Sequence, residues 1–356
     1  MSVLLVACGG GDGGNNNTGA GGSSGSGGRS GSGGGTGSGG SGSGGSSPGS
    51  GGSPGSGGSG AGGSAGGTLS TFKACTDQDR VGVFMLTVDD DAEAPFSSIT
   101  GSVLDGVEAH RAAKVVETID GCAIKQPPVV TAVCNTPCAA GELCTPQGKC
   151  VKQPNPHDLG KVTVTGLKKP LELSNVAFVY SNPATPALDH PAYNDGSDIT
   201  LSASGAGGYG PFSLKGVGVS KLEAGKTPIP AESGKEVKLT WSTPAKPVPA
   251  SRMHINFSVN KHGAVDTWLE CVVPDTGSFT LSARLTTELF KFGTSGFPSV
   301  DMSRRTSDTA MVPSGCVELV VNSPINRPLQ VPGIQSCSDD TECQAPKTCA
   351  QDLVCR

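Results

Sequence analysis

Short segments in which apolar and polar residues alternate recur along most of this chain, and alternation with a period of two predicts β-strands. Gly, Pro, Asn and Asp separate these segments, as they do in turns. The predicted strands are 81–88, 98–107, 114–119, 161–165, 177–180, 198–204, 211–219, 236–241, 253–259, 267–273, 278–281 and 317–321. One segment, 283–290, fits a short helix. The expected fold class is therefore mainly β.

The spacing of these strands predicts two β regions. The strands from 161 to 321 are typical of a β-sandwich, and the first three strands predict a smaller, separate β unit. Trp241 and Trp268 are expected to fill the core of the sandwich. The segment Gly205–Gly210 matches the nucleotide-binding pattern G-x-G-x-x-G. Its third glycine is followed by Pro211 and another strand, not by a helix, so a glycine-rich hairpin loop is expected instead of a nucleotide site.

The N-terminal part of the chain has a different composition. From Gly9 to about Gly67 nearly every residue is Gly or Ser, and such a stretch lacks the apolar side chains that could offset the entropy of ordering it. It is expected to be a disordered tether that spans roughly 40–45 Å on average. A match to G-x-S-x-G at Gly21–Gly25 lies inside it, without the strand-to-helix turn that activates such a serine.

These observations predict six regions along the 356 residues. They are a truncated signal peptide (1–8), the tether (9–67), a small β unit (68–130), a four-cysteine cluster (131–156), the β-sandwich domain (157–331) and a second four-cysteine cluster (332–356).

Charge and cysteine content narrow the function. The formal net charge is −5 and the basic residues are scattered, which argues against a nucleic-acid partner. The chain has thirteen cysteines, of which Cys8 stands alone and twelve lie in the folded part. An even set in loop-rich sequence is typical of a disulfide framework in an exported protein.

Leu5-Val6-Ala7-Cys8 resembles the lipobox of bacterial lipoproteins, in which the cysteine is lipidated and becomes the mature N-terminus. The resemblance implies a lipid anchor at Cys8, the odd cysteine of the set. Because only seven residues precede Cys8, and none is Lys or Arg, we expect the signal peptide to be truncated. Gly9, rather than Asp, follows the cysteine, and in these lipoproteins that favours the outer membrane.

The two clusters, CNTPCAAGELCTPQGKC and CSDDTECQAPKTCAQDLVC, form an internal repeat. Neither has the C-x₂-C pairs of a zinc knuckle, so disulfides are expected instead of metal. The favoured pairing is first to third and second to fourth, although spacing alone leaves other connectivities open. The predicted disulfides are Cys134–Cys144, Cys138–Cys150, Cys337–Cys349 and Cys343–Cys355, with Cys75–Cys122 in the small β unit and Cys271–Cys316 in the sandwich. Together with the lipobox and tether, these clusters resemble those of envelope lipoproteins of myxobacteria and related Gram-negative bacteria.

Candidate catalytic and metal-binding residues are sparse. The five histidines are dispersed and are expected to be surface or turn residues: His110, His157, His190, His254 and His262. Two acidic turns are weak candidates for calcium, which needs several converging oxygens. These turns contain Asp89, Asp90, Asp91 and Glu93, and Asp195 and Asp198, but neither has the D-x-D-x-D-G pattern. No cofactor is expected.

We therefore expect a non-enzymatic, lipid-anchored protein of the cell envelope, facing the periplasm or the cell surface, that binds protein or glycan or has a structural role. The alternative is a lipid-anchored hydrolase whose site is assembled only in the fold, with His254 or His262 beside a serine and a carboxylate. A third interpretation, in which the clusters act as protease-inhibitor-like modules, lacks a recognisable reactive-site sequence.

Overall fold

The computed structural model describes residues 68–108, 113–127, 134–145, 148–244 and 246–356. Cys8, the tether, the Gly21–Gly25 motif and His110 lie outside the described residues. The described part is mainly β. Its strands are β1 (Arg80–Asp89), β2 (Phe96–Val103), β3 (Lys114–Ile119), β4 (Cys122–Gln126), β5 (Glu142–Cys144), β6 (Cys150–Lys152), β7 (Val162–Thr165), β8 (Leu171–Glu172), β9 (Ser174–Val176), β10 (Val179–Ser181), β11 (Asp198–Ala203), β12 (Phe212–Val217), β13 (Ile229–Pro230), β14 (Val237–Thr240), β15 (Arg252–Ser258), β16 (Trp268–Pro274), β17 (Ser278–Leu281), β18 (Ser299–Val312) and β19 (Gly315–Gln330).

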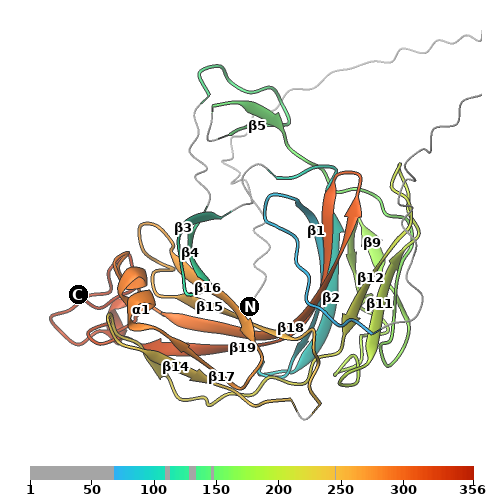
Figure 1. Ribbon diagram of the computed structural model, residues 1–356. Coiled ribbons are helices and arrows are strands. Elements are labelled where there is room, and N and C mark those ends of the chain that lie inside the picture. The colour runs from blue at the N-terminus through green and yellow to red at the C-terminus, as the bar shows by residue number, and fades with distance from the viewer. Residues whose placement is uncertain (1–67, 109–112, 128–133, 146–147, 245) are drawn as a thin grey trace, which may run out of the picture. The chain divides into compact units, whose positions relative to one another are not determined.

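An eleven-stranded sheet forms the centre of the fold, in the order β3-β4-β16-β15-β18-β19-β1-β2-β10-β9, with β13 pairing with β19 off this path. The long antiparallel pair β18–β19 runs from the region of α1 (Ala283–Phe290) to the region of β1 and β2 (Figure 1). The other sheets are β12-β11-β7-β8, β14-β17 and β5-β6.

Two hydrophobic cores pack against the shared sheet. In the first, β1, β2, β10 and β19 pack against the β12-β11-β7-β8 sheet, around residues such as Phe84, Ile99 and Leu201. Gly216 lies at a close approach of the two layers, because a Cβ there would come 2.6 Å from Val321 Cγ2. In the second core, β4, β15, β16, β18 and β19 pack against β14, β17 and α1, around residues such as Phe257. The sandwich is thus double, with one sheet common to both halves.

Helix α1 closes part of the second core, and its bounds are those predicted from the sequence. Ser282 caps the N-terminus, where its Oγ accepts a hydrogen bond from the N–H of Leu285. Leu285 and Leu289 are buried on one side of the helix, as a spacing of four residues requires.

A buried ion pair joins the two halves where both cores meet β18. The Arg304 side chain is 1% exposed and its partner Asp275 is 5% exposed, with Nε 2.7 Å from Oδ2. The Arg304 guanidinium also donates to the carbonyls of Ser220, Lys221 and Ser242. This explains why the 14-residue β18 was not predicted: polar side chains occupy inward positions at the joint, so its sequence does not alternate cleanly.

The separate small β unit predicted at 68–130 is wrong. Strand β1 pairs in parallel with β19, and β4 pairs with β16, so both belong to the central sheet. The predicted strand at 177–180 is also partly wrong, because Ala177 and Phe178 form the tight turn between β9 and β10. Pairing between distant segments, such as β1 with β19, leaves no local signature in the sequence.

All twelve cysteines in the described residues form disulfides. The four pairs within the clusters match the prediction: Cys134–Cys144, Cys138–Cys150, Cys337–Cys349 and Cys343–Cys355. The predicted pairs Cys75–Cys122 and Cys271–Cys316 are wrong, because the disulfides are Cys75–Cys316 and Cys122–Cys271. Cys75 precedes β1 and so lies beside Cys316 at the start of the parallel neighbour β19, whereas Cys122 and Cys271 are directly opposite across β4 and β16.

The two clusters share one local structure. In the first, the N–H of Thr145 donates to the carbonyl of Lys149, and Gly148 has a positive φ of 72°. In the second, Ala350 and Val354 make the equivalent bond, and Leu353 has a φ of 57°. The second cluster packs on the domain, since the carbonyl of Asp352 accepts a hydrogen bond from the N–H of Gly296 at 2.7 Å and Val354 is buried. The 3₁₀ turn η1 (Asp340–Glu342) contains two of the acidic residues of this cluster, Asp340 and Glu342.

Candidate functional site

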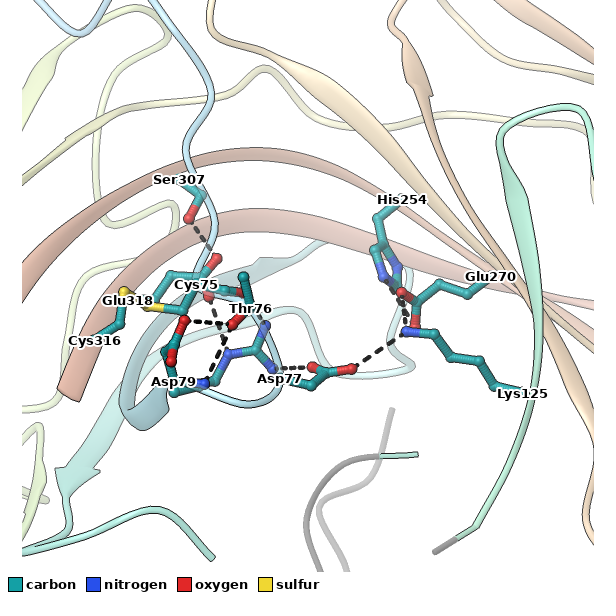
Figure 2. A network of polar contacts seen from close by, with 11 residues as sticks. Cys75, Thr76, Asp77, Asp79, Lys125, His254, Glu270, Ser307, Cys316 and Glu318 are labelled. Carbon is teal, nitrogen blue, oxygen red and sulfur yellow. Dashed lines mark hydrogen bonds and ion pairs between the residues drawn. A yellow bond between two sulfur atoms is a disulfide. The ribbon is translucent and has the colours of Figure 1, made fainter. Parts of the chain in front are cut away.

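A chain of alternating charges crosses the side of the central sheet that faces away from both cores (Figure 2). Glu270 on β16 accepts a hydrogen bond from Lys125 Nζ on β4 at 2.8 Å. Lys125 Nζ also lies 3.6 Å from Asp77, whose other oxygen is 3.2 Å from Arg80 Nη1. Arg80 Nε is 3.3 Å from Glu318 on β19. Each charge in this outward network has an opposite neighbour.

The loop that carries Asp77 is held in place from several sides. The Cys75–Cys316 disulfide ties the loop to β19, and Arg80 Nη2 donates to the carbonyl of Cys75 at 3.1 Å. Glu318 accepts a hydrogen bond from Ser307 Oγ at 2.6 Å. In Figure 2, Asp77 lies between this anchored group and the Lys125–Glu270 pair. The loop therefore bridges strands at opposite sides of β18.

His254 is the histidine of this network, with Nε2 3.7 Å from Glu270. Burial lowers the pKa of His254, and the nearby cations Arg305 and Lys125 act in the same direction against the opposing effect of Glu270. Burial would raise the pKa of Glu270, but its contacts with His254 and Lys125 lower it instead. At neutral pH we therefore assign a neutral imidazole beside a charged carboxylate.

The alternative hydrolase site would need a serine beside His254 or His262, and within the described residues neither imidazole ring is hydrogen-bonded to a serine hydroxyl. Ser303 lies opposite His254 across β15 and β18, but it is 4% exposed and its Oγ accepts a hydrogen bond from Arg305 Nε at 2.6 Å. The ring of His262 packs edge-on against Phe297 at 6.3 Å between centroids. His157 likewise packs against Tyr209, with ring centroids 3.8 Å apart.

A serine, a histidine and an aspartate do come together at another place, at the ends of β1 and β2. Ser97 Oγ lies 3.0 Å from His190 Nδ1, and His190 Nε2 lies 3.2 Å from Asp90 Oδ1. The side chains of His190 and Asp90 are 24% and 22% exposed. The sequence alone predicts a turn residue at His190 and does not single out Ser97. Their separation of 93 residues along the chain hides the arrangement.

Three of the calcium candidates, Asp89, Asp91 and Asp198, make other contacts. Asp89 Oδ1 accepts the N–H groups of Asp91 and Ala92, and Asp91 forms a two-pronged ion pair with Arg327 at 2.6 and 3.1 Å. Asp198 accepts a hydrogen bond from Thr68. Among the described residues, the only groups with the spacing of metal ligands are cysteine sulfurs, and these are in disulfides. The acidic turns in this part of the chain are therefore turns, without a carboxylate set that converges on a cation.

The remaining sequence predictions have mixed outcomes. Trp241 is in the second core, but Trp268 is partly exposed on the outward side of β16, so its predicted core role is wrong. Gly205–Gly210 lies in the loop between β11 and β12, as expected for a hairpin loop.

The sequence analysis missed the charged residues of the network, although Glu270 and Glu318 each stand alone in an apolar run, WLECVV and CVELVV. An isolated charge of that kind is the signal that could have identified them.

Comparisons with known proteins add little to this description. No protein-family model and no curated protein matches the sequence. A search of solved structures found the crystal structure of chicken CNTN1 FN1–FN3 domains, at 9% sequence identity, covering 64% of this chain and 71% of that chain. The TM-score of 0.17 is too low to support an argument about fold or function. Within the described residues, no helix is long and apolar enough to cross a membrane.

Proposed function

We propose that this chain is a lipid-anchored protein of the bacterial cell envelope, attached through Cys8, whose double sandwich binds protein or glycan. The supporting observation is the pairing of the cysteines. Twelve of the thirteen form disulfides within the described residues, and such a framework persists in oxidising, extracytoplasmic compartments. Cys8 is the one cysteine left over, at the position that a lipobox would use.

The outward side of the central sheet supports a binding role. Glu270, Asn256, Asp301 and Asn326 lie directly opposite one another across β16, β15, β18 and β19. Asn256, Glu270 and Asp301 are partly exposed and Asn326 is exposed. Their carboxylate and amide groups can bind the hydroxyl and amide groups that glycans and peptides carry.

Mass spectrometry of the native protein, extracted from membranes with and without reduction, tests the anchor and the disulfides together. We expect a lipid adduct on the peptide that begins at Cys8, and Cys8→Ser should release the protein from the membrane fraction. A control substitution in the same tether, Ser30→Ala, should leave the protein with the membrane. An unmodified Cys8 in membrane-associated protein would refute the anchor.

The binding role has its own test. Photo-crosslinking from position 256 on intact cells should capture a polymer or protein that is absent when the crosslinker replaces Thr163, a partly buried residue on β7 of the other sheet. Equal capture from both positions would contradict a binding role for this side of the sheet.

A further inference from the structure

We infer that Ser97, His190 and Asp90 form a nucleophilic site that hydrolyses small, unhindered acyl esters. This activity goes beyond the proposed envelope function and does not depend on it. The inference starts from the geometry: a nucleophile, a base and a carboxylate are joined by contacts of 3.0 and 3.2 Å, both within the reach that proton transfer requires.

The histidine has the tautomer that the reaction needs. Asp90 carries a negative charge and can only accept hydrogen bonds, so its contact with His190 Nε2 places the imidazole proton on that nitrogen. His190 Nδ1 then has a free lone pair and accepts the hydrogen bond that Ser97 Oγ donates. The carboxylate orients the base, and the base is oriented toward the nucleophile, which are the roles that define such a triad.

Asp90 is positioned by anchored neighbours on both sides. Asp89 Oδ1 closes the turn by accepting two backbone N–H groups, at 3.0 Å each. Asp91 is paired with Arg327, whose side chain is 5% exposed and also donates to the carbonyls of Ala224 and Gly225. Because the residues before and after Asp90 are both tied down, its carboxylate has little freedom to leave His190. Arg327 therefore acts as a positioning residue for the site.

Ser97 and His190 are also held in place by neighbouring packed residues. Ser97 lies in β2, opposite Val88 of β1 and two residues before the fully buried Ile99. His190 precedes Ala192 and Tyr193, which are 1% and 2% exposed in the first core. The three side chains come from two parts of the chain, the β1–β2 hairpin and the segment around His190, and packed elements hold both parts. The partial exposure of His190 and Asp90 leaves the site accessible to a substrate.

The reaction balances with water as its only co-reactant. Ser97 Oγ attacks the ester carbonyl carbon while its proton moves to His190 Nδ1. The bond to the alcohol oxygen breaks, and that oxygen takes the proton from His190. Water, deprotonated by the same nitrogen, then attacks the acyl-serine, and the proton returns to Ser97 Oγ as the carboxylic acid leaves. The products are one acid and one alcohol. Because the site is open to water, we expect small acyl groups with good leaving groups to react.

The test uses the full chain carrying Cys8→Ser, with a fluorophosphonate probe and 4-nitrophenyl acetate. We expect covalent labelling that maps to the peptide containing Ser97, and Ser97→Ala should abolish both labelling and ester hydrolysis. The matched control is Ser98→Ala, a neighbouring serine on the opposite side of β2, which should retain both. His190→Gln should lower the labelling rate by about 10²- to 10⁴-fold.

Several results would overturn the inference. These are the absence of labelling in the wild-type chain, labelling that survives Ser97→Ala, or an equal loss in Ser98→Ala. Thermal unfolding of each variant identifies a folding defect, and Asp90→Asn provides a second, isosteric variant that should slow labelling without a change in the fold. Lipidation of Cys8 is measured separately, so failure here leaves the proposed envelope function standing.

Discussion

The joint between the two cores can be tested by replacing Arg304 with Met. In the wild type, the Arg304 guanidinium donates to Asp275 and to the carbonyls of Ser220, Lys221 and Ser242. Methionine fills a similar volume but donates no hydrogen bond. The substitution leaves the carboxylate of Asp275 buried without its counter-ion, although Trp241 Nε1 at 2.8 Å and Ser251 Oγ at 3.1 Å still donate to it.

Removing one partner of a buried ion pair typically costs about 3–5 kcal/mol. A domain is usually stable by about 5–15 kcal/mol, so the Arg304→Met variant should lose a large part of its free energy of unfolding. Two of the donors to Asp275 survive, which places our expectation at about 3 kcal/mol, the lower end of that range. The uncharged amide introduced by Asp275→Asn could still accept from Trp241 Nε1 through its oxygen, and its NH₂ group could donate to Ser251 Oγ. The double variant Arg304→Met/Asp275→Asn should therefore lose less than the sum of the two single variants.

Urea unfolding followed by tryptophan fluorescence measures these free energies. The matched control is Lys291→Met, which removes an ion pair between Lys291 and Glu288 on the surface of α1, where the side chains are 58% and 23% exposed. Such a pair contributes at most about 1 kcal/mol. If Arg304→Met destabilised the protein no more than Lys291→Met does, the proposed role of the buried ion pair in joining the halves would be refuted.

The long disulfide, the Glu270 carboxylate and the turn at Ala177 each make a further prediction. Replacing Cys75 and Cys316 together by Ala should lower the free energy of unfolding by about 4–5 kcal/mol, because their disulfide closes a long loop. If urea unfolding showed a loss no larger than that of Cys138→Ala/Cys150→Ala, the effect of loop length would be refuted. Stability should fall as the pH drops below 4.5 and should continue to fall towards the folded-state pKa of Glu270, about 2, because the fold stabilises the charged form of this carboxylate. In Glu270→Gln, the dependence of Tm on pH should be weaker than in the wild type. Ala177→Gly should raise stability by about 0.5–1 kcal/mol, because Ala177 has a φ of 50° that glycine adopts without strain; a lower Tm than that of the wild type would show that the strain is absent.

Local features of the fold could be predicted from the sequence. Alternation located most strands, because a strand with one buried face must place apolar residues at every second position. The clusters' disulfides were also predictable, since their short segments bring few partners within reach. Helix 283–290 was evident from the spacing of Leu285 and Leu289. The disulfides of the clusters join cysteines only 10 or 12 residues apart, and the helix depends on a spacing of four residues.

Features that depend on distant segments could not be predicted in this way. The parallel pairing of β1 with β19 joins residues such as Phe84 and Leu319, and no pattern in either strand identifies the other. The two wrong disulfide predictions have the same cause, because proximity in sequence was the only available guide to the pairing. The contact between Ser97 and His190 was hidden for the same reason, since each residue alone resembles an ordinary turn or strand-end residue.

The parallel pairing of β1 with β19 also has a consequence for the order of folding during export. If the chain emerges from its N-terminus, β1 and β2 reach the oxidising compartment long before Gly315–Gln330 does, and β1 lacks its central neighbour until then. During that interval Cys75 can meet Cys122 more readily than Cys316, because shorter loops close at a lower entropic cost. The nearest-neighbour pairing would then be a kinetic trap, and its escape requires thiol–disulfide exchange. Maturation of this protein should therefore depend on a disulfide isomerase as well as an oxidase.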